Sequence, residues 1–300
     1  MNPHLTLNLV QDVRELLAYQ FMVNALEAAG VVAVMAAVVG WFMVLRRETF
    51  AGHTLSVMAF PGAAAAALAG LPLAVGYFVF CAAGALTIAG RRSVAQQSAV
   101  IGTVQAVGWA AGFVLLSLYG GVLEDLETLL FGSILGVTGG QVLTLALVAA
   151  CALAALALLG RRLFFASVDP PLAAAGGLPV RTLASAYLLV LGLAVAATAQ
   201  ITGVLLVFAL LLAPAAIARE LTPRIGLGLG LSVVLALLIA WVGLGLSYFT
   251  NYPSGFFVST LALVLFALAR GTRHLRGGAA SRLTRRRRAL GSPRGQAVGG

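Results

Sequence analysis

The sequence has 300 residues, of which 61% are hydrophobic and only 9% are charged. A water-soluble globule of this composition would leave large apolar areas facing water, so the composition indicates a protein that is embedded in lipid. The basic residues are all arginine, and the absence of lysine excludes a built-in P-loop ATPase, because that loop needs a lysine to reach the nucleotide phosphates.

Apolar stretches long enough to cross a bilayer recur along the whole chain. About 20 apolar residues make one helical crossing. Turn or charge signals, such as Arg46 with Arg47 and the Gly70-Leu71-Pro72 corner, separate one stretch from the next. We therefore predict an all-α, polytopic membrane helical bundle with about nine transmembrane helices, at 21–45, 54–71, 72–90, 99–119, 141–160, 183–200, 202–219, 226–248 and 254–270.

The arginine clusters predict the orientation of this bundle. Positively charged loops stay on the cytoplasmic side. Placing Arg46 and Arg47 inside puts the N-terminal segment 1–20 outside the cell, and the alternating path then brings the later arginine pairs to the cytoplasmic side. We expect a membrane domain over 21–270, with the C-terminus in the cytoplasm.

The chain ends in a strongly basic segment. Nine of the nineteen arginines lie at or after Arg270, with few apolar residues among the last ten. This pattern predicts a disordered cytoplasmic tail over 271–300 that lies near anionic membrane lipid, and not a nucleic-acid site.

The long cytoplasmic loop contains the signals of one short helix. Asp169 can cap a helix that has Pro170 at its first position, and Gly176 with Gly177 can end it. A short, capped surface helix between two spans is typical of a docking element, so we expect a protein partner there.

Two of the spans contain helix-breaking residues. Pro61 and Gly62 lie in the second span and Pro214 lies in the seventh. Membrane helices tolerate such residues where protein or a wet cavity supplies other hydrogen-bond partners, so these positions are candidates for a translocation path. A kink that serves packing alone is the alternative.

Four segments together carry a resemblance to a known family: FGSILGV at 131–137, DPPLAAAGGLPVR at 169–181, GVLLVFALLLAPAAIAR at 203–219 and YPSGFFVST at 252–260. In this order the sequence resembles the zinc/manganese/iron ABC transporter permease family, over roughly residues 21–270. The resemblance implies the fold of a type II ABC importer permease. It also implies that the chain is the channel-forming subunit of a cell-membrane importer, and that this importer carries a divalent transition metal (zinc, manganese or iron).

That resemblance also implies the partners. Two permease copies work with two cytoplasmic ATPase copies and an extracytoplasmic metal-binding protein. The chain itself is then not an enzyme and binds no cofactor, because the ATPase subunit uses the ATP. The short cytoplasmic helix becomes the element that couples the permease to the ATPase, through Asp169, Leu172, Ala173, Gly176, Gly177 and Leu178.

The start of the second span departs from the family pattern. The family usually reads GDxLSHAxLPG, whereas this chain reads GHTLSVMAFPG, with His53 at the Asp position and Val57 at the His position. Residues four apart share one helix face, so the usual pair of metal ligands is lost. His53 can still offer an imidazole to a transition metal, with Ser56 one turn away as an oxygen neighbour. The alternative is that His53 is simply a polar residue at the cytoplasmic end of a helix.

Other function classes fit less well. The sequence has no serine-histidine-aspartate set, HExxH motif or paired intramembrane acids, which argues against an intramembrane enzyme. A secondary transporter, or a permease for a non-metal solute, stays the alternative, although an ion-driven transporter ordinarily needs a buried carboxylate on its path.

Overall fold

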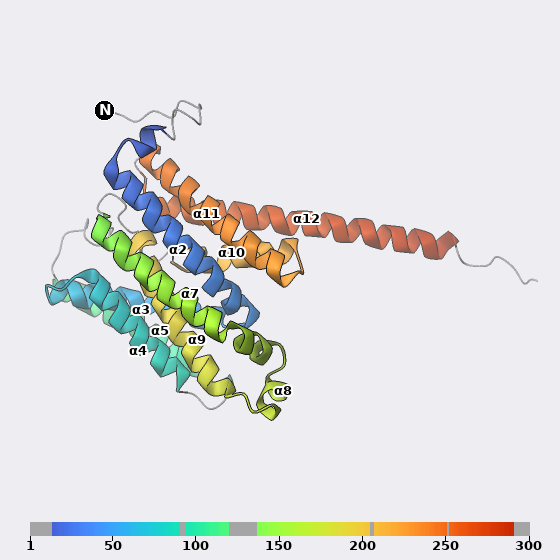
Figure 1. The fold of residues 1–300 in the computed structure, drawn as a ribbon, viewed down its shortest axis with the longest axis horizontal. Helices are drawn as coiled ribbons and strands as arrows, with labels where there is room; N and C mark the ends of the chain where they lie inside the picture. Colours follow the sequence, from blue (N-terminus) through green and yellow to red (C-terminus); the bar gives the residue numbers. More distant parts are fainter. Residues whose placement is uncertain (1–13, 91–93, 120–136, 205–206, 251, 291–300) are drawn as a thin grey trace, which may run out of the picture.

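The computed structural model describes residues 14–90, 94–119, 137–204, 207–250 and 252–290, with the side chains of 94–97 and 273–290 left out. In this part of the chain the regular structure is α-helical (Figure 1). The helices are α2 (Gln20–Leu45), α3 (Thr49–Leu68), α4 (Leu73–Ala89), α5 (Val94–Tyr119), α7 (Gly139–Val168), α8 (Pro170–Ala175), α9 (Val180–Thr202), α10 (Val207–Leu221), α11 (Ile225–Thr250) and α12 (Ser254–Leu290).

The all-helical membrane fold predicted from the sequence is confirmed, and each predicted span overlaps one of these helices. Seven of the helices are long and apolar enough to cross a membrane. The other two predicted spans form shorter helices, α4 with 17 residues and α10 with 15. At 1.5 Å per residue α10 is about 22 Å long, which is less than the hydrocarbon thickness of about 30 Å.

Several predicted boundaries were wrong, and two of them concern neighbouring helices α7 to α10. The span predicted over 202–219 does not begin at residue 202, because α9 continues through Thr202 and ends at Gly203, whose φ of 72° is left-handed. The span predicted over 141–160 is longer, because α7 continues past Arg161 and Arg162 to Val168.

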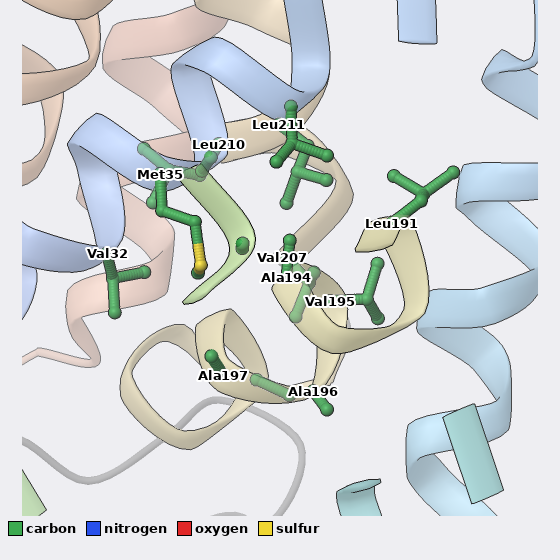
Figure 2. Close-up of a cluster of buried hydrophobic side chains, with 14 of the residues drawn as sticks. Val32, Met35, Leu191, Ala194, Val195, Ala196, Ala197, Val207, Leu210 and Leu211 are labelled. Atoms are coloured by element: carbon green, nitrogen blue, oxygen red, sulfur yellow. The ribbon is translucent and has the colours of Figure 1, made fainter. Parts of the chain in front are cut away.

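The helices form two groups around a shared centre (Figure 1). On one side α3 packs against α4 and α5, and α4 packs against α9; on the other side α11 and α12 pack against α10, and α11 also packs against α2. The centre is the contact of α2 with α7, α9 and α10. Figure 2 shows part of it, where buried side chains of α2, α9 and α10 meet: Val32, Met35, Leu191, Ala194, Val195, Ala196, Ala197, Val207, Leu210 and Leu211.

Small residues let these helices approach each other closely. A Cβ at Gly40 of α2 would lie far inside van der Waals contact distance of the Leu211 carbonyl oxygen in α10. Gly62 of α3 and Gly76 of α4 are opposed in the same way, each against the backbone of the other. Lipid supplies no hydrophobic drive for helix association, so such close backbone contacts hold the bundle together.

The C-terminal helix runs past the predicted end of the membrane domain at residue 270. Its backbone is helical as far as Leu290, and residues 291–300 lie outside the described part. The division into an outer segment 1–20, a membrane domain 21–270 and a disordered tail 271–300 stays a prediction. The motif at 131–137 also lies outside the described residues, except for Val137.

Candidate coupling helix and translocation path

The short helix predicted after Asp169 is present as α8. The Leu172 backbone N–H donates to Oδ1 of Asp169 at 3.0 Å, and Pro170 occupies the first turn, where its missing N–H costs nothing. At the other end, Gly176 N–H donates to the Leu172 carbonyl at 2.9 Å, and Gly177 takes a φ of 79° that favours glycine. The local sequence therefore determines both ends of α8.

The side chains of α8 divide between the bundle and the surface. Ala173 is fully buried, and its carbonyl accepts from the Leu178 backbone N–H at 3.0 Å, while Leu178 itself packs against the core. Leu172 is 56% exposed. The α8 helix is thus fixed to the membrane helices through Ala173 and presents an unpartnered leucine on its outer side.

The second candidate region begins in the first turns of α3. His53 is half-buried, and its Nδ1 atom is buried with no hydrogen-bond partner among the described residues. Its ring lies edge-on to Phe208 in the first turn of α10, with the ring centroids 5.1 Å apart. The His53 imidazole therefore has a free nitrogen close to the point where the short helix α10 begins.

The neighbours of His53 on α3 are differently engaged. Ser56 is buried, and its hydroxyl donates to the Gly52 carbonyl of its own helix at 3.1 Å. Thr54, which the sequence did not single out, donates from its hydroxyl to Oε1 of Gln105 on α5 at 3.1 Å. Nothing in the local sequence indicated the Thr54 contact, because its partner lies in another span.

The remaining predicted path residues are buried in two different helices. Pro61 and Gly62 lie in α3, where Gly62 also forms the close contact with α4, and Pro214 lies inside α10. The structure brings α3 and α10 together at His53 and Phe208.

The described residues contain no group of three or more His, Cys, Asp or Glu side chains that could hold a metal ion. His53 is the candidate ligand that the sequence predicted, and it supplies one imidazole nitrogen. A complete coordination sphere around a passing ion would need further ligands.

Comparison with known proteins identifies the family. The model of the ABC 3 transport family matches residues 18–271. The chain is 30% identical over 264 residues to the manganese transport system membrane protein MntC of Halalkalibacterium halodurans, covering 87% of this chain and 90% of that protein. It is 27% identical over 250 residues to the chelated iron transport system membrane protein YfeC of Yersinia pestis, covering 83% and 85%.

A solved structure supports the same assignment. A chain of PsaBC from Streptococcus pneumoniae in complex with Fab superimposes with a TM-score of 0.76 at 28% identity, covering 87% of this chain and 95% of that one. The family match extends from α2 through the membrane part of α12, and it includes α8 and the His53 region. The chain therefore belongs to the ABC 3 transport family.

Proposed function

We propose that this chain is the membrane permease of an importer for manganese or iron. The observation that carries the proposal is the match, over nearly the whole length of both chains, to proteins named for manganese and for chelated iron transport. As a membrane subunit of an ABC system the chain is not itself catalytic, and ATP is used by a separate ATPase.

The assembly we propose has this permease in two copies, with an ATPase on the cytoplasmic side and a metal-binding protein outside the cell membrane. The exposed Leu172 on the capped helix α8 supports α8 as the seat of the ATPase. The arginines around α8 support a cytoplasmic location for it, because Arg161, Arg162 and Arg181 are all exposed and positively charged loops stay inside. The C-terminus is then cytoplasmic and segment 1–20 is outside.

The buried Nδ1 atom of His53 supports a transition-metal cargo. An imidazole whose buried nitrogen has no hydrogen-bond partner in the described part of the chain can bind a passing metal ion without first breaking a hydrogen bond. Imidazole suits iron better than manganese, which prefers carboxylate oxygens. The residue at this position therefore bears on the choice between the two metals.

The test is transport in proteoliposomes that contain the permease, its ATPase and its binding protein. We expect ATP-dependent uptake of radiolabelled manganese or iron, and no uptake when the ATPase is left out. Uptake of zinc alone would make zinc the cargo in place of manganese and iron. ATP-dependent uptake of a non-metal solute, without uptake of any of the three metals, would contradict the metal cargo. The chain would then still be a permease, but for another solute.

A substitution at His53 tests the role of the imidazole. We expect His53→Asp to raise the ratio of manganese to iron uptake, because a carboxylate replaces the imidazole. His53→Gln is the matched control, since it keeps a polar side chain without a strong metal ligand, and it should lower uptake of both metals. Unchanged uptake in both variants would remove His53 from the path.

A further inference from the structure

A buried ion pair lies in the turn between α2 and α3. Oε1 of Glu48 accepts from Nη2 of Arg46 at 2.8 Å and from Nε at 3.2 Å. The two side chains are only 8% and 12% exposed. Removing two charges from water is costly, and a buried ion pair is often no more stabilising than apolar residues of the same volume. Stability alone is therefore a weak explanation for this pair.

The same guanidinium contacts two further helices. Nη1 of Arg46 donates to the hydroxyl of Ser167 in the last turn of α7 at 3.2 Å. The guanidinium also lies over the ring of Tyr187 in α9, 5.1 Å from the ring centroid, and the Tyr187 hydroxyl donates to the Val39 carbonyl of α2 at 3.0 Å. One side chain thus joins α2, α7, α9 and the start of α3.

These contacts lie next to the helix that we propose as the ATPase seat. Ser167 is two residues before Asp169, which caps α8, and the α8 helix is fixed to its neighbours through the buried Ala173. A displacement of α8 therefore acts directly on the end of α7, where Ser167 holds the Arg46 guanidinium.

The other end of the connection is α3. Glu48 is the residue before the first turn of α3, but its carboxylate is bound to Arg46 and does not cap the helix. The preceding residue, Arg47, has a φ of 59°, a left-handed conformation that is strained for a residue with a side chain. α2 and α3 otherwise touch little, since α3 packs mainly on α4 and α5. The turn and its ion pair are thus the main link from α2 to the start of α3, five residues before His53.

The Glu48 carboxylate can accept more hydrogen bonds than the described residues donate to it. Oε2 of Glu48 is buried and has no hydrogen-bond partner among the described residues. An unsatisfied buried oxygen of this kind favours a second arrangement in which it finds a donor, so the site is suited to having two states.

We propose that Arg46 is a positioning residue for transport, which passes the movement of α8 through Ser167 to Glu48 and so to the helix that carries His53. This inference rests on the proposed function, because it assumes that an ATPase moves α8. It gives a role to Arg46, Glu48 and Ser167, which the motif resemblance does not assign. The Arg46 guanidinium then connects the ATPase seat with the translocation path.

The test uses the complete transporter in proteoliposomes and measures the metal taken up per ATP hydrolysed. Ser167→Ala removes one contact of Arg46 and keeps the ion pair. Arg46→Lys keeps the charge, but a single ammonium cannot bond to Glu48 and Ser167 and also stack on Tyr187. We expect both variants to assemble and to hydrolyse ATP, with the ratio of metal to ATP about two- to thirtyfold lower.

The matched control is Arg219→Lys. Arg219 also reaches α2 at this end of the bundle, donating from Nη1 to the Val44 carbonyl at 3.1 Å, but among the described residues it forms no hydrogen bond with α7 or α3. Its ratio of metal to ATP should equal that of the wild type. An unchanged ratio in Ser167→Ala and Arg46→Lys would overturn the inference. So would a loss of hydrolysis and uptake in proportion to the amount of assembled complex, which is the signature of a purely structural role. If the wild type moves no metal, the proposed function fails first and the inference fails with it.

Discussion

Truncation of Leu172 on α8 should weaken the binding of the ATPase without unfolding the permease. Fully burying a leucine side chain stabilises a protein by about 1.5–3 kcal/mol. Because Leu172 is 56% exposed in the permease alone, the part that remains to be buried under the ATPase is worth about 0.8–1.7 kcal/mol. The Kd for the ATPase should therefore rise about four- to seventeenfold in Leu172→Ala. Leu172→Asp should raise it further, because it places a charge in the contact.

The measurement is a titration of purified ATPase onto the permease in nanodiscs. Leu68→Ala is the matched control, because Leu68 is a similarly exposed leucine, at 45%, on the last residue of α3 at the opposite end of the bundle. Ala173 is the wrong position for this test, since it is fully buried and a charge there would disrupt α8 itself. If Leu172→Ala binds the ATPase as tightly as the wild type and Leu68→Ala do, then α8 is not the docking helix.

Three further predictions concern stability. Gly40→Ala should destabilise the protein by about 1–3 kcal/mol and lower its melting temperature in detergent, because the new Cβ meets the Leu211 carbonyl oxygen. The control Gly230→Ala should keep the wild-type melting temperature, because its Cβ meets nothing within 4 Å. Equal melting temperatures of the two variants would contradict the close contact at Gly40. Asp169→Ala should cost about 0.5–2 kcal/mol of local stability, seen as faster hydrogen exchange in α8, with Asp169→Asn close to the wild type. Burial raises the pKa of Glu48 above its ordinary 4.5, although Arg46 acts to lower it. The folded state therefore binds the Glu48 proton more tightly than the unfolded state does. The contribution of Glu48 to the free energy of unfolding is lost as the pH rises from 4.5 through the folded pKa. Melting temperatures across that range should fall with pH in the wild type more steeply than in Glu48→Gln, and parallel curves would contradict this.

The membrane fold could be predicted because its signal is local. A run of about 20 apolar residues is visible in any window of the sequence, and the ends of α8 follow from an aspartate, a proline and two glycines next to each other. The start of α7 was predictable in the same way but was missed. Thr138 and Gln141 form a capping box there, with the Gln141 N–H donating to Oγ1 of Thr138 and the Thr138 N–H donating to Oε1 of Gln141.

The contacts between helices could not be predicted, because they depend on rotation and depth in the bilayer. Arg46 and Glu48 looked like ordinary loop charges, and Ser167, the second partner of Arg46, lies 121 residues away from it. The end of α7 was placed too early for a related reason. Arg161 and Arg162 mark the edge of the apolar stretch, but the helix itself needs only hydrogen bonds to continue, and it does so with both side chains exposed.

The shortness of α10 has a consequence for how the protein enters the membrane during synthesis. Its 15 residues include Arg219 and Glu220 near the end, and each charged residue disfavours insertion of a segment on its own. The chain between α9 and α10 is also buried at Gly203 and Val204, where irregular backbone is tolerated only under the cover of neighbouring protein. We therefore expect α9 and α10 to be released into lipid together as a hairpin, and α10 to reach its final place only after α11 has been made.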